Sequence, residues 1–164
     1  MVYIGLGSNI GNRFALLQEA VDCIDSRIGT ILSVSKVYET PAWGFESEVF
    51  LNACIKIETK YTAFEVLEAL LSIENKLGRD RNSREGYQAR PIDLDILLFK
   101  NDVISQKHLQ LPHPRMELRQ FVLTPLADIA ASIVHPQLQK SIEELQQICE
   151  DDSVLSIWNE QLKF

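Results

Sequence analysis

The chain has few cysteines and no long hydrophobic run. Only Cys23, Cys54 and Cys149 are present, an odd number in no CxxC spacing, so neither a disulfide framework nor a zinc site is expected. No apolar run approaches the ~20 residues that a membrane-spanning helix needs. The first residues lack the basic region of a signal peptide and reach Gly and Asn early, so no signal peptide is expected. These absences predict a globular protein of the cytoplasm.

Positive charge is also scarce. The chain has 16 Lys and Arg against 23 Asp and Glu, a net charge of −7 and a pI near 5.0, which argues against general nucleic-acid binding. Its 164 residues, 46% of them hydrophobic, fit a single domain, residues 1–164, with a sizeable core.

One stretch, residues 90–99, concentrates the features that suggest chemistry. From Ile92 it is apolar and free of Gly and Pro, as in a buried strand, but Asp93 and Asp95 interrupt it. Strand residues i and i+2 face the same side, so the carboxylates lie roughly 6–7 Å apart, repel each other and favour a bound cation. Four arginines precede them within residues 79–90, and this combination suggests polyphosphate held with magnesium.

The rest of the pattern predicts an α+β fold, with helices over a mostly antiparallel sheet. Strands are expected at 2–6, 31–39, 50–58, 92–99 and 103–104. Helices are expected at 13–28, 62–77, 117–131, where Pro125 kinks or divides the helix, and 141–150. The inward faces expected for the first two helices are Phe14, Leu17, Val21, Ile24 and Ile28, then Phe64, Leu67, Leu70, Leu71 and Leu77. The apolar tail at 154–158 is expected to pack on the body.

The glycine-rich segment after the first strand does not fit a dinucleotide fingerprint. Gly5 and Gly7 have the right spacing, but the next glycine, Gly11, is one residue late. We interpret the segment as a strand-to-helix turn with Asn12 as the helix N-cap.

Aromatic residues gather in two further places. Trp43 and Phe45 lie in a loop bounded by Pro and Gly, where they either form a ligand wall or fold onto the core. Phe50 and Asn52 share one face of a strand, and this pair either binds a flat heterocycle or belongs to ordinary surface.

The core Arg90-Pro-Ile-Asp-Leu-Asp-Ile-Leu resembles the signature of the 6-hydroxymethyl-7,8-dihydropterin pyrophosphokinase family of folate biosynthesis. Further matching segments occur in the family's order along nearly the whole chain: Gly7-Ser8-Asn9, Tyr38-x-Thr40-Pro41, Phe50-Leu51-Asn52, Ile73-Glu74, Gly78-Arg79-x-Arg81, Leu111-Pro112-His113, Arg119-x-Phe121 and Pro125-Leu126. The resemblance implies a ferredoxin-like sheet with helices packed on both faces.

The resemblance also implies the reaction, which is transfer of the pyrophosphoryl group of ATP to the hydroxymethyl oxygen of the pterin, with release of AMP. Asp93 and Asp95 match residues that hold two Mg²⁺ ions, and Arg79 and Arg90 match arginines that clamp the phosphates; these four are the implied catalytic residues. The implied ATP-binding residues are Glu74, Arg81, Tyr87, Arg90, Ile96, His113 and Arg119. Glu74 has the alternative of an ordinary solvated helix acid.

For the pterin, the resemblance implies Thr40, Pro41, Trp43, Phe50, Asn52 and Phe121, with Asn52 reading the polar edge and Phe121 stacking on the ring. The sequence departs from the family most at Tyr87-Gln88-Ala89-Arg90, where many members carry Trp-Gly-Pro-Arg.

Two alternatives stay open: a magnesium-dependent kinase of another small acceptor, and a non-enzymatic ferredoxin-like module that binds a metabolite. We expect a monomer that binds small molecules and neither nucleic acid nor membrane.

Overall fold

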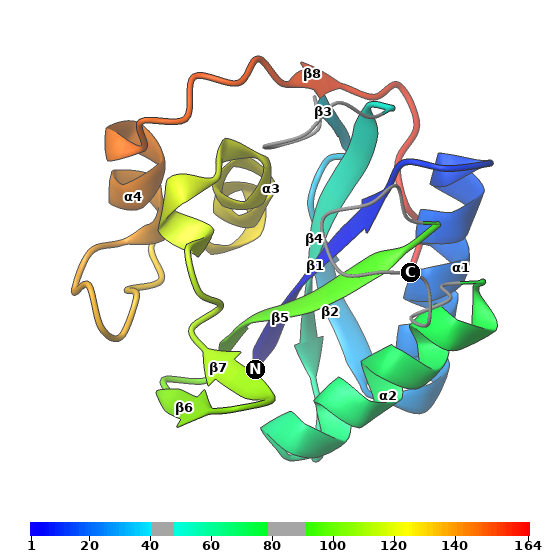
Figure 1. The fold of residues 1–164 in the computed structure, drawn as a ribbon, viewed down its shortest axis with the longest axis horizontal. Helices are drawn as coiled ribbons and strands as arrows, with labels where there is room; N and C mark the ends of the chain where they lie inside the picture. Colours follow the sequence, from blue (N-terminus) through cyan, green and yellow to red (C-terminus); the bar gives the residue numbers. More distant parts are fainter. Residues whose placement is uncertain (41–47, 79–90) are drawn as a thin grey trace.

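A six-stranded sheet lies between two pairs of helices in the computed structural model, which describes residues 1–40, 48–78 and 91–164 (Figure 1). The elements in chain order are β1 (Val2–Ser8), α1 (Arg13–Arg27), β2 (Thr30–Val34), β3 (Tyr38–Thr40), β4 (Phe50–Glu58), α2 (Ala63–Lys76), β5 (Asp93–Phe99), β6 (Ile104–Gln106), β7 (Leu109–Leu111), a 3₁₀ turn (Met116–Leu118), α3 (Gln120–Ala130), α4 (Ile142–Ile148) and β8 (Ser156–Ile157).

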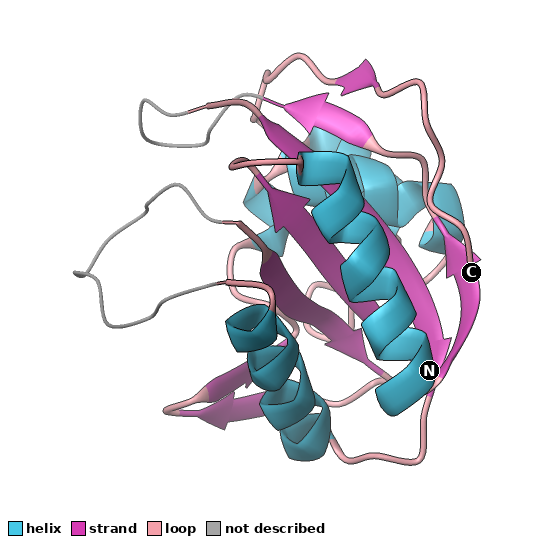
Figure 2. Ribbon diagram, turned by 90° about the vertical axis from the view of Figure 1, so that its right-hand side faces the viewer, coloured by secondary structure: helices cyan, strands magenta, loops and turns pink. Residues whose placement is uncertain are grey.

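The sheet has the order β5-β1-β4-β3-β8, and β2 also pairs with β4. Each strand pair in the described part of the chain is antiparallel. Helices α1 and α2 cover one face, in front of the sheet in Figure 2, and α3 and α4 lie on the other side of it in Figure 1. The α+β, ferredoxin-like prediction is confirmed; β5 is the edge strand on one side of the sheet, and β2 and β8 are edge strands on the other.

Three helices begin where the sequence predicted. The side chain of Asn12 accepts a hydrogen bond from the Ala15 N–H at 3.2 Å, and α1 starts at the next residue. Thr62 and Ser141 each form a capping box with the Glu three residues later and begin α2 and α4. Gly78, with φ of +93°, follows the end of α2, as glycine does after many helices.

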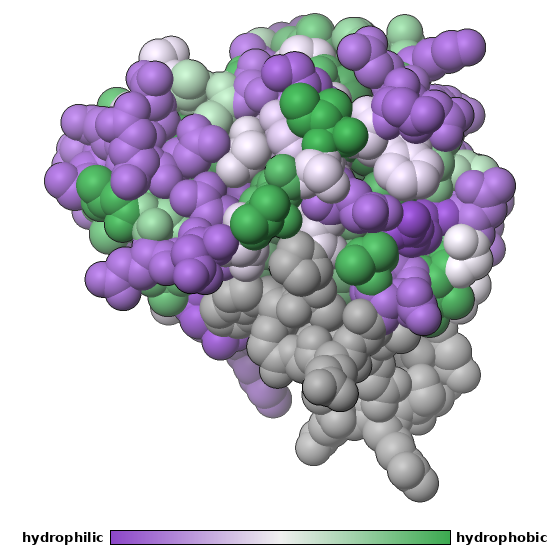
Figure 3. Space-filling model, turned by 90° about the horizontal axis from the view of Figure 1, so that it is seen from above, coloured by the Kyte–Doolittle hydropathy of each residue, from purple (hydrophilic) through white to green (hydrophobic). Residues whose placement is uncertain are grey.

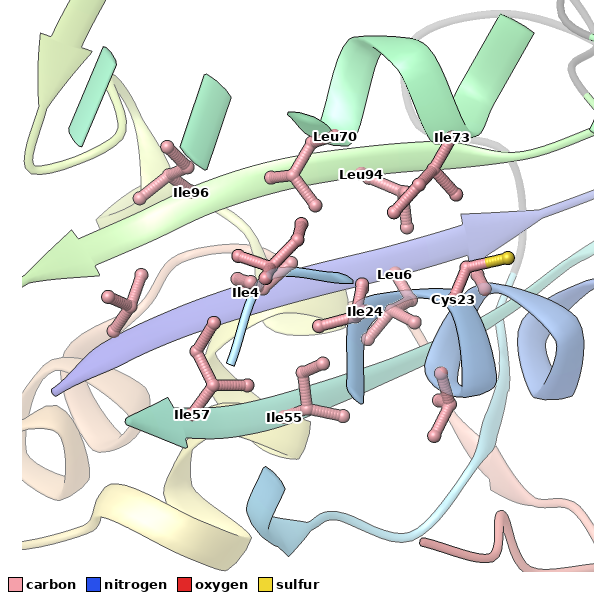
Figure 4. Close-up of a cluster of buried hydrophobic side chains, with 14 of the residues drawn as sticks. Ile4, Leu6, Cys23, Ile24, Ile55, Ile57, Leu70, Ile73, Leu94 and Ile96 are labelled. Carbon is pink, nitrogen blue, oxygen red and sulfur yellow. The ribbon is translucent and has the colours of Figure 1, made fainter. Parts of the chain in front are cut away.

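The larger core lies between the sheet and the pair α1 and α2 (Figure 4). Side chains of β1, β4 and β5, among them Ile4 and Ile55, meet Ile24 of α1 and Leu70 of α2, and all four are fully buried. Each such side chain contributes about 1.5–3 kcal/mol on burial. A second cluster, with Tyr3, Cys54, Leu97, Leu98 and Leu123 among its members, lies between the other face of the sheet and α3 and α4. The sheet is therefore anchored on both faces.

Several predicted boundaries are wrong. The strand expected at 31–39 is two strands, β2 and β3, because Ser35 interrupts it: its Oγ donates to Lys36 O and accepts from Cys54 N–H. The strand expected at 2–6 continues to Ser8, so the turn into α1 is shorter than predicted and comprises residues 9–12. The short strand expected at 103–104 is β6, which begins at Ile104 and pairs with β7.

Two helical predictions also need correction. Phe64 is 40% exposed, since the buried face of α2 runs through Ala63, Val66, Leu70 and Ile73. The helix expected from 117 is divided at the extended residue Arg119 rather than at Pro125, which lies inside α3.

His135 is a buried polar residue. Its Nδ1 accepts hydrogen bonds from the backbone N–H groups of Gln137 and Leu138 at 3.3 and 3.2 Å. His135 thus holds the turn between α3 and α4.

On the face seen in Figure 3, the described residues are mostly hydrophilic, with hydrophobic groups scattered among the polar ones. None of the helices in the described ranges combines the length and the apolar character that crossing a membrane requires.

Candidate active site

The two acids of β5 lie on the sheet face that carries α3. Asp93 is opposite Gly7 and Asp95 is opposite Gly5 in the β1–β5 pair, so both carboxylates stand beside positions of β1 that have no side chain. Both residues are half-buried, and the Asp95 side chain is 47% exposed. The predicted geometry, two acids on one face at i and i+2, is confirmed for the backbone.

Gly7 also separates Asp93 from the polar and aromatic pair of β4. Asn52 is the β4 partner of Gly7. A Cβ added at Gly7 would lie 2.9 Å from Asn52 Oδ1, 3.7 Å from Phe50 Cδ1 and 4.0 Å from Asp93 Cβ. One row across three strands therefore runs from the acid pair to the predicted heterocycle-binding residues.

Asn52 is fixed by its neighbour on β3. Its Nδ2 donates a hydrogen bond of 2.6 Å to Thr40 Oγ1, and both residues are buried. A buried amide held in one orientation can present its remaining polar atoms to a ligand.

His113 and Arg119 approach the acids from the segment between β7 and α3. His113 Nε2 lies 3.8 Å from Asp95 Oδ2, which is too long for a hydrogen bond. Burial, the largest cause, acts with the cations Arg119 and Arg115 to lower the pKa of His113 to about 4, although Asp93 opposes the shift. The imidazole is therefore neutral at pH 7, and no partner for its buried Nδ1 occurs in the described ranges.

Arg119 is a buried cation at the start of α3. The residue is only 6% exposed, and its Cζ lies 5.8 Å from the centroid of the Phe121 ring. The Cys54 Sγ lies 3.9 Å from Val122 O, so the first turn of α3 rests on β4 beside Gly5. The fold thereby brings Arg119 and Phe121 to the face that holds the acid pair.

Glu74 is not an ordinary solvated helix acid, which was the alternative interpretation of this residue. It is fully buried, and its Oε1 accepts a hydrogen bond of 2.8 Å from the Leu94 N–H. Leu94 lies between the two acids on the edge strand, so the Glu74 carboxylate holds the backbone on which they stand. Ile96 is buried, with its side chain in the larger core, so its contact with a nucleotide would involve its backbone.

Six predicted site residues lie outside the described residues: Pro41, Trp43, Arg79, Arg81, Tyr87 and Arg90.

Sequence reasoning missed the part played by Gly5, Gly7 and Ser8. Gly7 has no side chain between Asp93 and Asn52, and the Leu97 side chain packs over Gly5. Ser8 Oγ donates a 2.6 Å hydrogen bond to Pro91 O just before β5. Glycines at i and i+2 within an apolar run were the available signal, because they mark positions without a side chain on one face of a strand.

The donor atoms fit Mg²⁺. Carboxylate oxygens are hard ligands, and Asp95 is accessible enough to accept a hydrated ion. Within the described residues there is no group of three or more His, Cys, Asp and Glu that could hold a metal ion. An ion at Asp93 and Asp95 would complete its shell with water and phosphate oxygens, as Mg²⁺ commonly does.

Comparisons with known proteins show which proteins the chain is similar to. The family model of 7,8-dihydro-6-hydroxymethylpterin-pyrophosphokinase (HPPK) matches residues 3–131. A 2-amino-4-hydroxy-6-hydroxymethyldihydropteridine pyrophosphokinase of Porphyromonas gingivalis is 42% identical over 140 residues, covering 84% of this chain and 95% of the relative. Its namesake from Bacillus subtilis is 45% identical over 135 residues, covering 81% of this chain and 80% of the relative.

Among solved structures, the wild-type HPPK-DHPS of Plasmodium falciparum matches with a TM-score of 0.73 at 16% identity. The match covers 89% of this chain but 44% of the Plasmodium chain, so this chain spans less than half of that protein. At this identity the likeness supports the fold alone.

Proposed function

The chain belongs to the 7,8-dihydro-6-hydroxymethylpterin-pyrophosphokinase family, and from that premise we propose that it transfers the pyrophosphoryl group of ATP to 6-hydroxymethyl-7,8-dihydropterin in folate biosynthesis. The structural observation that carries the proposal is the row Asp93–Gly7–Asn52, which joins an acid pair to a buried amide on one sheet face. In this proposal the two substrates meet near Gly7 of β1.

In the proposed reaction the hydroxymethyl oxygen of the pterin attacks the β-phosphorus of ATP. A bond forms between that oxygen and the β-phosphorus, the bond from the β-phosphorus to the α,β-bridging oxygen breaks, and AMP leaves with that oxygen. The hydroxyl proton is released. Positioning and charge neutralisation account for most catalysis of this kind.

Asp93 and Asp95 would hold Mg²⁺, two ions in our proposal, between the triphosphate and the pterin hydroxyl. Bound magnesium neutralises phosphate charge and lowers the pKa of a coordinated hydroxyl. The carboxylates fix where this charge lies, because β1 holds their strand on one side and Glu74 holds it on the other. Arg79 and Arg90 are proposed to clamp the phosphates.

The other proposed ATP contacts surround the same edge of the sheet. Arg119 supplies a fixed positive charge, and neutral His113 supplies a hydrogen-bonding nitrogen without adding charge. Ile96 offers the backbone of the edge strand. We also propose that ATP contacts Glu74, Arg81 and Tyr87.

On the pterin side, Asn52 is proposed to read the polar edge of the ring, since Thr40 holds its amide in one orientation. Phe121 and Phe50 supply stacking faces. Pro41 and Trp43 are also proposed to bind the pterin. All of these residues come from one chain, so we propose a monomer, acting in the cytoplasm where ATP and magnesium are abundant.

The proposal is tested by incubating the protein with ATP, magnesium and 6-hydroxymethyl-7,8-dihydropterin and then analysing the nucleotides. AMP should form in equimolar amount with the pyrophosphorylated pterin. Formation of ADP would instead indicate a kinase of another type, and ATP consumption that does not depend on the pterin would indicate a different acceptor. No turnover at all would favour a binding module.

Gly7→Ala tests whether Asn52 reads the pterin. The new Cβ lies 2.9 Å from Asn52 Oδ1, so the amide must shift away from its present position. We expect the KM for the pterin to rise about tenfold, the cost of roughly one hydrogen bond, while the KM for ATP changes little. Steady-state kinetics with each substrate varied in turn measures both.

Gly11→Ala is the matched control for that variant, since nothing lies within 4 Å of a Cβ at Gly11. Its positive φ of +69° leads us to expect a loss of stability without a change in either KM. A Gly7→Ala enzyme with an unchanged pterin KM would contradict the role of Asn52.

A further inference from the structure

The guanidinium of Arg13, the first residue of α1, joins segments that are far apart in the sequence. Its Nη2 lies 2.9 Å from Glu39 Oε2 on β3, and its Nη1 donates a 2.9 Å hydrogen bond to Val49 O just before β4. Its Cζ lies 5.4 Å from the centroid of the Trp158 ring in the C-terminal tail. A planar fork with several donors suits such simultaneous contacts, which a lysine cannot reproduce.

Each polar contact of Arg13 falls next to a residue proposed to bind the pterin. Glu39 precedes Thr40, the partner of Asn52, and Val49 precedes Phe50. Thr40 and Phe50 face each other in the β3–β4 pair, so Arg13 holds both strands at the place where they carry these residues. Arg13 itself touches none of the proposed pterin ligands through the contacts described above.

The C-terminal tail completes this arrangement. Ser156 and Ile157 form β8, which pairs with Glu39 and Tyr38 of β3 (Figure 1), and the backbone N–H of Trp158 donates a 2.8 Å hydrogen bond to Val37 O. Further along, the backbone of Lys163 exchanges two hydrogen bonds of 2.9 Å with the side chain of Gln18 on α1. The tail thus spans from β3 to α1 and covers the Arg13 guanidinium with the Trp158 ring.

This tail lies outside residues 3–131, which match the family model. Strand β3 has only three residues, so its position depends on its neighbours β4 and β8 and on the Arg13–Glu39 ion pair. If the free protein already holds these strands in place, binding does not have to order them, and the affinity for the ligand is higher.

We propose that Arg13 and Trp158 form a clamp that positions Thr40, Phe50 and Asn52 for the pterin. Both are positioning residues rather than ligands, and the C-terminal tail is thereby part of the pterin half of the site. The inference rests on the proposed function.

The test compares Arg13→Gln, Arg13→Lys and Trp158→Leu with the unaltered enzyme. For Arg13→Gln and Trp158→Leu we expect the pterin KM and the pterin Kd from calorimetry to rise about five- to tenfold, with kcat and the ATP KM within about twofold. Arg13→Lys keeps the charge but not the fork, so it should recover only part of the affinity. The double variant Arg13→Gln/Trp158→Leu should lose less than the product of the two single losses, because the two side chains act together.

Arg27→Gln is the matched control. Arg27 lies at the other end of α1, where its Nη2 donates a 3.3 Å hydrogen bond to Ser72 Oγ, and its loss should leave both KM values unchanged. If Arg13→Gln does not fold, Trp158→Leu and Arg13→Lys carry the same test.

A pterin KM that is unchanged in folded variants would overturn the clamp, as would equal rises in the pterin and ATP KM values. These outcomes differ from failure of the proposed function, in which the unaltered enzyme itself forms no AMP from ATP and the pterin.

Discussion

Replacement of Asp95 by asparagine is expected to lower kcat for pyrophosphoryl transfer by about two to three orders of magnitude. Asparagine keeps the shape of the side chain but removes one of the two negative charges that would hold Mg²⁺. A bound metal contributes several kcal/mol of transition-state stabilisation, and each ~1.4 kcal/mol is a factor of ten in rate. The Asp95 side chain is 47% exposed, so the free energy of unfolding should change by less than about 0.5 kcal/mol.

The measurement is kcat across a magnesium series up to saturation, together with binding of Mn²⁺ to the enzyme–nucleotide complex, followed by electron paramagnetic resonance. Weaker Mn²⁺ binding would locate the defect at the metal rather than at the fold. Asp102→Asn is the control, because Asp102 is an exposed acid in the turn just after β5. Near-normal turnover of Asp95→Asn at saturating magnesium would refute the metal-holding role.

The second large effect is expected at Glu74. Leucine in its place would leave the buried Leu94 N–H without the acceptor it has at 2.8 Å, at a cost of about 1–3 kcal/mol in the free energy of unfolding. Because Leu94 lies between Asp93 and Asp95, its displacement moves both carboxylates. A shift of about 1 Å in a catalytic group can cost ~100-fold in rate, so we expect kcat to fall by about ten- to a hundredfold.

Glu74→Gln separates this positioning role from a direct nucleotide contact. Its amide oxygen can still accept the Leu94 N–H, so kcat should stay within several-fold of the unaltered enzyme. Glu68→Leu, at an exposed position of the same helix, is the control and should change neither stability nor rate. If Glu74→Gln and Glu74→Leu raise the KM for ATP equally while kcat is unchanged, the carboxylate acts on the nucleotide and the positioning role is wrong.

Patterns that are local in the chain predicted their structures well. The alternation in residues 50–58 predicted β4 with both its bounds, and the capping boxes at Thr62 and Ser141 predicted the starts of α2 and α4. The acid pair was placed on one strand face by its spacing alone. Each of these depends on backbone geometry over a few residues, so the sequence contains the information directly.

Predictions failed where distant contacts decide. Ser35 ends β2 because it forms a hydrogen bond with Cys54 of a neighbouring strand. The buried face of α2 differs from the predicted one, because packing against the sheet selects which residues of the helix turn inward.

The sequence by itself determined that this protein has an acid pair on one strand, an arginine-rich segment before it and an α+β pattern of elements. The tertiary structure alone decided what these features face. The β1 register places Gly7 between Asp93 and Asn52, Glu74 reaches across from α2 to hold Leu94, and Arg13 meets Trp158 from the far end of the chain. Periodicity fixes which side of a strand a residue occupies, but pairing between strands and packing between layers fix its neighbours, because they depend on burial summed over the whole chain.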